Sequence, residues 1–165
     1  MGDIIKKQDH RREFVDTLNE LAEKDDKIIV LIPDVGFLYL DDPKNKFKVI
    51  NTGVTEQSTI MIAVGLALSG FKPYVYSMIN FVLFRPYEMV RNGIVNHHAN
   101  VKLLGVKGSS SYKFLGFSHN MTSDTEDTDA CKNLGLDSFV PKSNEEVRET
   151  ILSTYNSSKA AYIRL

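Results

Sequence analysis

The side chains of this 165-residue chain that could do chemistry fall in short polar segments, each placed after an apolar run. Asp34 follows "IIVLIP", Glu56 ends the turn "NTGVTE" after "FKVI", and Phe81 follows "VYSM". His119, in "GFSHN", comes after the apolar run "LLGV". Carboxylates and imidazoles accept and donate protons, and an aromatic ring at a turn can face a ligand. If these segments share one edge of the fold, their side chains form a candidate site for proton transfer.

Glu56 has a second reading, because it stands directly ahead of the apolar run "STIMIAVGLAL", where the spacing predicts a helix. An acid in the first turn of a helix is stabilised by the partial positive charge there, by ~0.3–1 kcal/mol. Taken alone, the spacing favours this structural role. The small neighbours of Glu56, however, would let its side chain reach into a cleft.

Other combinations of reactive residues are weaker. Ser110, His119 and Asp124 are the residue types of a hydrolase triad, but the chain has no G-x-S-x-G turn to expose the serine. His97 and His98 end a predicted helix without further ligands at metal-binding spacing. The acidic run "SDTEDTD" lacks the glycine and final Glu of a calcium loop, and neither G-x-G-x-x-G nor G-x-x-x-x-G-K-[ST] occurs. We therefore expect no metal ligands in this chain and no phosphate cradle.

Helical and strand patterns alternate along the whole chain. Helices are predicted over about residues 11–24, 55–69, 85–97, 123–133 and 143–156, and strands over about 27–33, 47–50, 72–78, 101–106, 138–141 and 160–165. Nearly continuous apolar strands that alternate with helices are typical of a parallel sheet covered on both faces. We expect an α/β fold with an open, doubly wound, mainly parallel sheet and helices on both faces. Ligands bind such sheets at the carboxyl ends of the strands, which the candidate residues follow.

Length and composition fit one globular domain, residues 1–165, with 42% apolar and 25% charged residues. The net charge of −1, from 20 basic and 21 acidic residues, gives no pull toward nucleic acid or anionic lipid. The single cysteine, Cys131, cannot form an internal disulfide, which fits a reducing compartment. The charged N-terminus lacks the apolar segment of a secretory signal, and the longest apolar run, 60–68, is too short to span a bilayer. We expect a cytoplasmic protein without nucleic-acid or membrane partners.

The stretch "NTGVTEQSTIMIAVGLALSGFKPYVYSM", followed by Phe81, "RPYEMVRN" and "GFSHN", resembles the pyrimidine-binding domain of thiamine-diphosphate enzymes of the transketolase type. The pattern G-[IV]-x-E-Q, then a helix and G-x-K-P-x-V, carries most of the specificity. The resemblance covers nearly the whole chain, from "IPDVGF" to "DSFVPKSNEEV". It extends to 1-deoxyxylulose-5-phosphate synthase and to the C-terminal subunits of split transketolases, and it implies the same doubly wound fold.

The resemblance also implies a role for each candidate residue. The Glu matching Glu56 hydrogen-bonds N1′ of the cofactor's aminopyrimidine, which promotes deprotonation of the thiazolium C2, and the aromatic residue matching Phe81 stacks on the pyrimidine. Asp34 would lie near the cofactor's rings, and His119 would reach the substrate or intermediate. Phe84 joins the expected cofactor contacts, although its spacing from Phe81 also fits a helix stripe packed on the sheet. The expected catalytic residues are therefore Glu56 and His119, and the expected cofactor contacts are Glu56, Phe81, Asp34 and Phe84.

The resemblance implies that this chain supplies only half of a thiamine diphosphate site. In the family a G-D-G…N motif on a separate domain holds the diphosphate and its Mg²⁺ or Ca²⁺, and no G-D-G occurs here. The diphosphate-binding and transketolase C-terminal domains are expected to be absent. The initiating Met favours a stand-alone small subunit over a fragment, with a homodimer of pyrimidine domains inside a heterotetramer with a diphosphate-binding subunit. The expected reaction is ketol or acyl transfer from a ketose or 2-oxo donor, with the chain inactive alone.

The segment "KFLGFSHN" departs from the family pattern G-x-D-G-P-T-H-Q. Leu115 replaces an acid that would contact substrate hydroxyls, and Phe117 replaces a proline, which puts the usual sugar-phosphate specificity in question. An alternative is a non-catalytic paralogous binding or regulatory domain that retains the fold and the dimer surface. A signalling receiver domain also has a strand ending in Asp and a Lys-Pro pair, but "VYSMIN" offers no phosphorylatable Asp.

Overall fold

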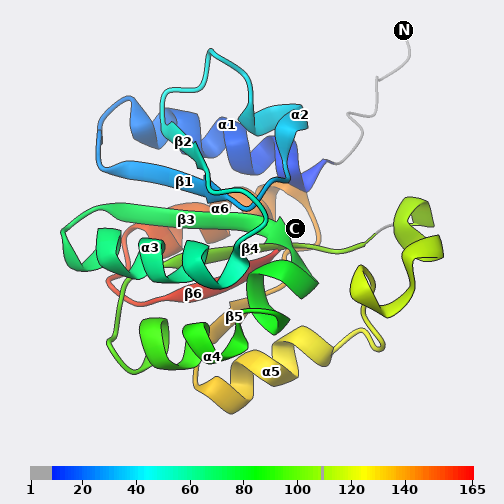
Figure 1. Ribbon diagram of the computed structural model, residues 1–165. Helices are drawn as coiled ribbons and strands as arrows, with labels where there is room; N and C mark the ends of the chain where they lie inside the picture. The colour runs from blue at the N-terminus through cyan, green and yellow to red at the C-terminus, as the bar shows by residue number, and fades with distance from the viewer. Residues whose placement is uncertain (1–8, 109) are drawn as a thin grey trace, which may run out of the picture.

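The computed structural model describes residues 9–108 and 110–165 and contains a six-stranded parallel sheet with helices on both faces (Figure 1). The strands are β1 (Ile28–Ile32), β2 (Lys48–Asn51), β3 (Lys72–Met78), β4 (Lys102–Val106), β5 (Asp137–Phe139) and β6 (Ala161–Arg164). Their order across the sheet is β2-β1-β3-β4-β6-β5, and each pair of neighbours is parallel. The predicted doubly wound α/β fold is confirmed.

The side chains of the central strands alternate between two apolar cores, one on each face of the sheet. Within β1, Ile28 and Val30 belong to one core, and Ile29 and Leu31 belong to the other. All of β1 is buried. A strand that is covered on both faces needs apolar residues at every position, which explains the unbroken run "IIVLI".

Helices from both halves of the chain cover the two faces (Figure 1). The first face carries α1 (His10–Ala22), α2 (Phe37–Leu40) and α6 (Asn144–Tyr155). The second carries α3 (Glu56–Leu68), the π-helical η1 (Asn80–Phe84), α4 (Tyr87–Met89), the π-helical η2 (Val90–Val95) and α5 (Glu126–Leu134). A 3₁₀ segment, η3 (Ser110–Ser118), lies between β4 and α5 in the chain. Among the described residues, no helix combines the length and apolar character needed to cross a bilayer.

The helix predicted over residues 85–97 differs most from the structure, because helical winding begins at Asn80 and is π-helical in two stretches. The Arg85 N–H donates to the Asn80 carbonyl at 2.9 Å, and the Asn96 N–H donates to the Arg91 carbonyl at 3.0 Å. Both bonds span five residues instead of four. Such turns are rare, occur mostly at functional sites and leave no mark in apolar spacing, so the sequence pattern could not reveal them.

The two helix starts predicted from capping boxes differ in the structure. Helix α5 begins at Glu126 rather than at a cap made by Ser123, and the Glu126 carboxylate accepts a hydrogen bond from the Thr122 N–H at 2.6 Å. At α6, Ser143 is the N-cap, and its hydroxyl accepts a hydrogen bond from the Glu146 N–H at 3.2 Å. Capping by the serine is therefore confirmed only for α6.

We expect Ser143→Ala to lower the free energy of unfolding by about 1 kcal/mol, because the Glu146 N–H loses its acceptor at the start of α6. Urea denaturation followed by circular dichroism measures this loss. Ser153→Ala is the matched control, since Ser153 is an exposed serine of the same helix whose hydroxyl donates to the Thr150 carbonyl. Equal losses in the two variants would contradict a capping role for Ser143.

Candidate functional site

The loops that carry the candidate residues lie at one edge of the sheet, because all the strands run in the same direction. We call this the carboxyl edge. Glu56 is the first residue of α3, which follows β2, and Phe81 lies in η1 just beyond the end of β3. Asp34 follows β1, and His119 follows η3 after β4. The topology therefore gathers the predicted residues where doubly wound sheets bind ligands.

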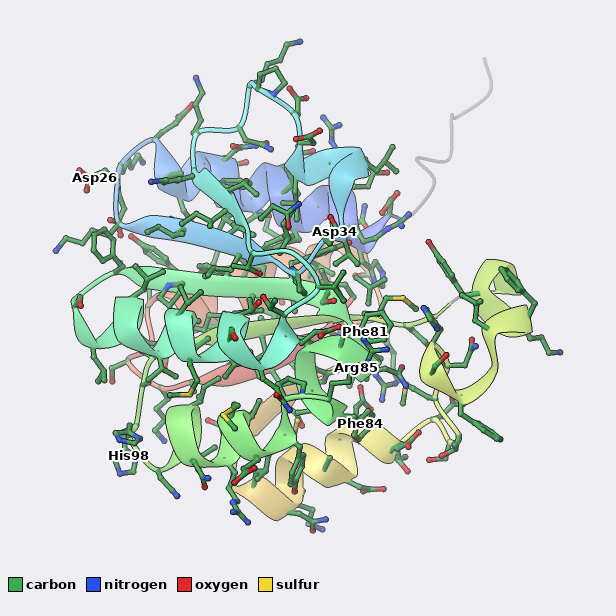
Figure 2. All side chains as sticks on the ribbon, viewed as in Figure 1. Asp26, Asp34, Phe81, Phe84, Arg85 and His98 are labelled. Atoms are coloured by element: carbon green, nitrogen blue, oxygen red, sulfur yellow. The ribbon has the colours of Figure 1, made fainter. Side chains whose placement is uncertain are left out.

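Glu56 and Phe81 are connected by Arg85, which sequence reasoning did not single out. Arg85 Nη1 lies 2.6 Å from Glu56 Oε1, and Arg85 Cζ lies over the Phe81 ring, 4.1 Å from its centre. The Glu56 side chain is 11% exposed, against 45% for Arg85. Figure 2 shows Phe81 and Arg85 beside each other at the end of α3 that Glu56 begins. Glu56 is thus a sheltered carboxylate that faces a cation and, beyond it, an aromatic ring.

The start of η1 fixes this arrangement. Phe81 and Arg85 are four residues apart, a spacing that brings side chains to the same side of a helical segment. The Asn80 side-chain amide donates to the Phe117 carbonyl at 3.0 Å, so the end of η3 is tied to the start of η1. This bond holds the loop that carries His119 against the same edge.

His119 joins the group through Phe81. Their ring centres are 5.0 Å apart and the ring planes meet at 84°, an edge-to-face arrangement that aromatic pairs prefer. Nδ1 of His119 pairs with the Ser118 hydroxyl at 2.7 Å, and the Tyr112 ring stacks nearly parallel at 6.3 Å. An acid, an aromatic ring and an imidazole therefore do meet at the carboxyl edge, as their positions in the sequence predict.

The alternative hydrolase triad gains no support from this geometry. Asp124, the acid of that triad, pairs with Lys107 Nζ at 2.5 Å, and His119 Nδ1 pairs with Ser118. The side chain of Ser110 lies outside the part of the structure that is described.

Asp34 and Phe84 lie elsewhere. Asp34 adopts a left-handed backbone conformation with φ 58°; its N–H donates to Asn51 Oδ1 at 3.1 Å, and its Oδ1 accepts from Asn51 Nδ2 at 3.3 Å. Phe84 is partly buried and packs against the apolar core on the α3 face of the sheet. Its position fits the helix-stripe reading. The cofactor contacts expected of these two residues stay predictions.

A cavity of ≈ 490 Å³ opens at the carboxyl edge on the side of α1 and α2. Asp34, Gly36, Tyr76, Arg11 and Lys107 contribute to its walls. Gly36 has φ +87°, and a Cβ there would stand 2.7 Å from the Tyr76 ring, so only glycine lets the loop after β1 lie against that ring. Burial raises the pKa of Tyr76 to about 12, so its hydroxyl stays protonated at neutral pH. Two cations and a neutral phenol suit an anionic, hydroxylated ligand.

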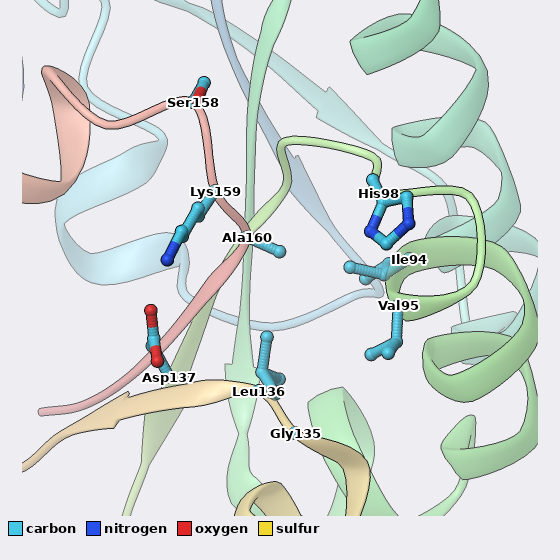
Figure 3. Close-up of a pocket in the computed structure, with 9 residues that line it drawn as sticks. All are labelled: Ile94, Val95, His98, Gly135, Leu136, Asp137, Ser158, Lys159 and Ala160. Atoms are coloured by element: carbon cyan, nitrogen blue, oxygen red, sulfur yellow. The ribbon is translucent and has the colours of Figure 1, made fainter.

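A second cavity, of ≈ 590 Å³, lies at the opposite end of the sheet, beside the amino-terminal ends of β4, β5 and β6 (Figure 3). Figure 3 shows His98 on one side of this cavity and Asp137 and Lys159 on another. The length of the strands separates it from the Glu56 group. Within residues 9–108 and 110–165, no three side chains of His, Cys, Asp or Glu are grouped to hold a metal ion.

Arg85, Arg11 and Lys107 are the site residues that sequence reasoning missed. Arg85 directly follows the aromatic run "NFVLF", so a cation and the acid Glu56 occupy two loops of one edge. That juxtaposition is a usable signal for an ion pair once the strand order is known. Arg11 and Lys107 come from α1 and from the end of β4, and only the folded chain brings them to one cavity.

Comparisons with known proteins identify relatives of this chain. The family model described as "Transketolase, pyrimidine binding domain" matches residues 6–165. One of the two subunits of an apulose-4-phosphate transketolase from Phocaeicola vulgatus is 35% identical over 117 residues, which are 69% of this chain and 38% of that protein. The 6-deoxy-6-sulfo-D-fructose transketolase subunit SqwH of a Clostridium species is 28% identical over 170 residues, or 98% of this chain and 51% of the relative. The chain thus spans about half or less of the length of these relatives.

Solved structures give the same picture. A split gene transketolase, described as an inactive beta4 tetramer, matches with a TM-score of 0.78 at 26% identity over 94% of this chain and 50% of its own. The transketolase of Campylobacter jejuni matches with a TM-score of 0.78 at 16% identity over 96% of this chain and 26% of its own, which supports the fold alone. Because the family model accounts for nearly its full length, the chain belongs to the family of transketolase pyrimidine-binding domains.

Proposed function

We propose that this chain is the pyrimidine-domain subunit of a split, thiamine-diphosphate-dependent transketolase-like enzyme that transfers a ketol or acyl group from a ketose or 2-oxo donor. The observation that carries the proposal is the sheltered Glu56 carboxylate next to the face of Phe81, in a chain of the transketolase family. Bound thiamine diphosphate supplies the electron sink that carbon–carbon bond cleavage requires. The residues of this chain bind one end of it and control a proton there.

Each side chain of the group suits one task. The Glu56 carboxylate is sheltered enough to hydrogen-bond the aminopyrimidine N1′ and to hold a proton there with little competition from water. Phe81 offers a flat apolar face for the same ring, an interaction that stabilises aromatic pairs by ~0.5–1.5 kcal/mol. His119 stands edge-on to Phe81, and because its Nδ1 pairs with Ser118, we assign Nε2 to the substrate.

We assign the diphosphate and its Mg²⁺ or Ca²⁺ to a partner subunit, since no metal-binding group is present among the described residues. Exposed aromatic side chains beside His119 suit the docking of that partner. Phe114 is 82% exposed and Phe117 is 81% exposed, and both lie on η3 at the carboxyl edge. The related split gene transketolase is described as inactive as a beta4 tetramer, which supports a requirement for a second kind of chain.

The outer face of α3 suits a second copy of this chain. Its apolar side chains are exposed although the helix is apolar nearly all round: Met61 and Ile62 are each 44% exposed and Leu68 is 62% exposed. A helix of this kind is normally covered. Gly65 lies on the same helix, and nothing stands within 4 Å of a Cβ built there, so another helix can approach closely. Two such copies and two partners give the proposed heterotetramer.

The substrate is proposed to enter the cavity lined by Arg11 and Lys107, whose cations favour an anionic group at one end of a hydroxylated donor. Two relatives are named for a sugar phosphate and for a sulfo-sugar, which supports this substrate class. The exposed Leu115 replaces the acid of the family pattern, so hydroxyl recognition is where specificity is expected to differ.

Reconstitution tests the proposed function. The chain is mixed with a candidate partner that carries a G-D-G…N domain, and thiamine diphosphate is titrated by calorimetry in the presence of Mg²⁺. We expect saturable binding and turnover of a ketose donor in the mixture only. A complex that forms but neither binds the cofactor nor turns over would favour the alternative, a non-catalytic paralogous domain that retains the fold and the dimer surface. The replacement of the family acid by Leu115 is the observation behind that alternative.

In the reconstituted complex, we expect Phe81→Leu to weaken thiamine diphosphate binding by roughly three- to tenfold, the factor that corresponds to losing an aromatic pair. Calorimetry measures the Kd, after circular dichroism has established that the variant folds. Phe139→Leu on β5 is the control, because Phe139 is 36% exposed at the far edge of the sheet. Unchanged cofactor affinity in Phe81→Leu would remove Phe81 from the binding site.

A further inference from the structure

We propose that the Arg85 side chain is an internal competitor of the cofactor. It makes with Glu56 and Phe81 the two contacts that the aminopyrimidine ring makes when bound, so it must move aside before that ring can enter. The inference rests on the proposed function, in which Glu56 and Phe81 hold the ring. It assigns to Arg85 the control of cofactor affinity in this chain.

The positions of the atoms exclude simultaneous occupancy. The Arg85 guanidinium carbon lies over the Phe81 ring at 4.1 Å from its centre, close to the separation of roughly 3.5–4 Å at which a second flat group would stack there. Arg85 Nη1 meets Glu56 Oε1 at 2.6 Å, along the edge where an N–H of the bound ring would donate. A ring that stacks on this face of Phe81 and reaches Glu56 needs the volume that the guanidinium fills.

The two groups also match in chemistry. A guanidinium is a planar, delocalised cation whose N–H donors lie in its plane. A 4-aminopyrimidine that carries a proton on a ring nitrogen is likewise planar, with N–H donors in the plane and charge shared across nitrogen–carbon–nitrogen units. Each can stack on an aromatic face while donating to a carboxylate. Arg85 therefore imitates the ligand instead of merely blocking it.

The strength of the Arg85 contacts suits a displaceable group. Because 45% of the Arg85 side chain is exposed, water and salt compete for it, and neither contact reaches the strength of a buried pair. An exposed ion pair together with an exposed cation–π contact would hold back a competing ligand by roughly three- to tenfold. Cofactor affinity is then predicted to rise when the guanidinium is removed.

The test uses the chain alone and the free aminopyrimidine half of the cofactor, 4-amino-5-hydroxymethyl-2-methylpyrimidine, titrated by NMR. We expect Arg85→Met, which keeps the length of the side chain but lacks the charge, to bind this probe roughly three- to tenfold more tightly than the wild type. Arg85→Lys, which keeps the charge but lacks the flat face, is expected between the two. Arg91→Met is the matched control, since Arg91 lies further along the same helical region and donates to Asn92.

A second measurement decides the question even if the probe binds too weakly to measure. In the wild-type chain without probe, the guanidinium ¹⁵N signals of Arg85 should show a ring-current shift from Phe81 and slower rotation than those of Arg91. Glu56→Gln should release the rotation. Signals of Arg85 that match those of Arg91 would overturn the proposal.

The outcomes separate this inference from the proposed function. If Arg85→Met binds the probe no more tightly than the wild type while Glu56→Gln and Phe81→Leu weaken binding, Arg85 is not a competitor and the proposed function stands. If Glu56→Gln and Phe81→Leu both bind the probe like the wild type, the proposed function fails, and the competition fails with it.

Discussion

Replacing Glu56 by glutamine is expected to lower the kcat of the reconstituted enzyme by about 10²–10⁴-fold while the chain still folds and joins its partner. The amide keeps the size of the side chain and one oxygen acceptor. It cannot hold the proton that the carboxylate shares with the aminopyrimidine, and it also loses the charge that Arg85 contacts at 2.6 Å. Steady-state kinetics with a ketose donor give kcat and KM, and thermal unfolding by circular dichroism checks the fold.

The control for this prediction is Glu145→Gln, because Glu145 is also an acid in the first turn of a helix, α6. If Glu56 only interacts with the helix dipole, the two variants will both be active and differ little from the wild type in stability. Full activity of Glu56→Gln would therefore leave the dipole as its only role. The position of Glu56 as the first residue of α3 satisfies both roles, so only activity tells them apart.

Most of the fold could be predicted because its strands are apolar for a simple reason. A strand covered on both faces has no polar position, so "IIVLI" and "KPYVYSM" are visible in the sequence, and the second coincides with β3. The segments that escaped prediction lack a repeating pattern. In η3 aromatic and polar residues mix around Gly116, whose φ of 63° breaks the winding, and in η1 the π-helical turn depends on one local hydrogen bond.

The candidate site was predictable to the extent that topology determines it. Parallel strands bring the loops after β2, β3 and β4 to one edge, so Glu56, Phe81 and His119 meet without any further condition. The contacts between them depend on side-chain conformation, which spacing does not encode. Arg85 reaches Glu56 only because the π-helical turn aims it there, and Asp34 turns toward Asn51 because its backbone is left-handed.

The largest stability effect is expected at Asp127, which is fully buried. Tyr162 Oη donates to Asp127 at 2.5 Å and Arg164 Nε donates at 2.9 Å, so this carboxylate ties α5 to β6. Asp127→Ala removes the only negative charge from this contact and leaves the guanidinium and the hydroxyl of its two donors without that acceptor. Removing one partner of a buried ion pair costs about 3–5 kcal/mol, a large share of the total stability of about 5–15 kcal/mol of a typical domain. Urea denaturation measures the loss.

The acid limb of the pH profile tests whether this loss is electrostatic. Burial alone would raise the pKa of Asp127, but the hydrogen bonds from Arg164 and Tyr162 outweigh burial and hold the pKa below its usual 3.8. A carboxylate with a depressed folded-state pKa stabilises the fold fully above its unfolded pKa and progressively less as the pH falls through the folded value. The gap between wild type and Asp127→Ala should therefore narrow below about pH 4. Asp124→Ala removes an exposed neighbouring acid that pairs with Lys107, and it should leave the urea midpoint unchanged. A gap for Asp127→Ala that stays constant into acid would show that lost packing, and not the lost charge, destabilises the variant.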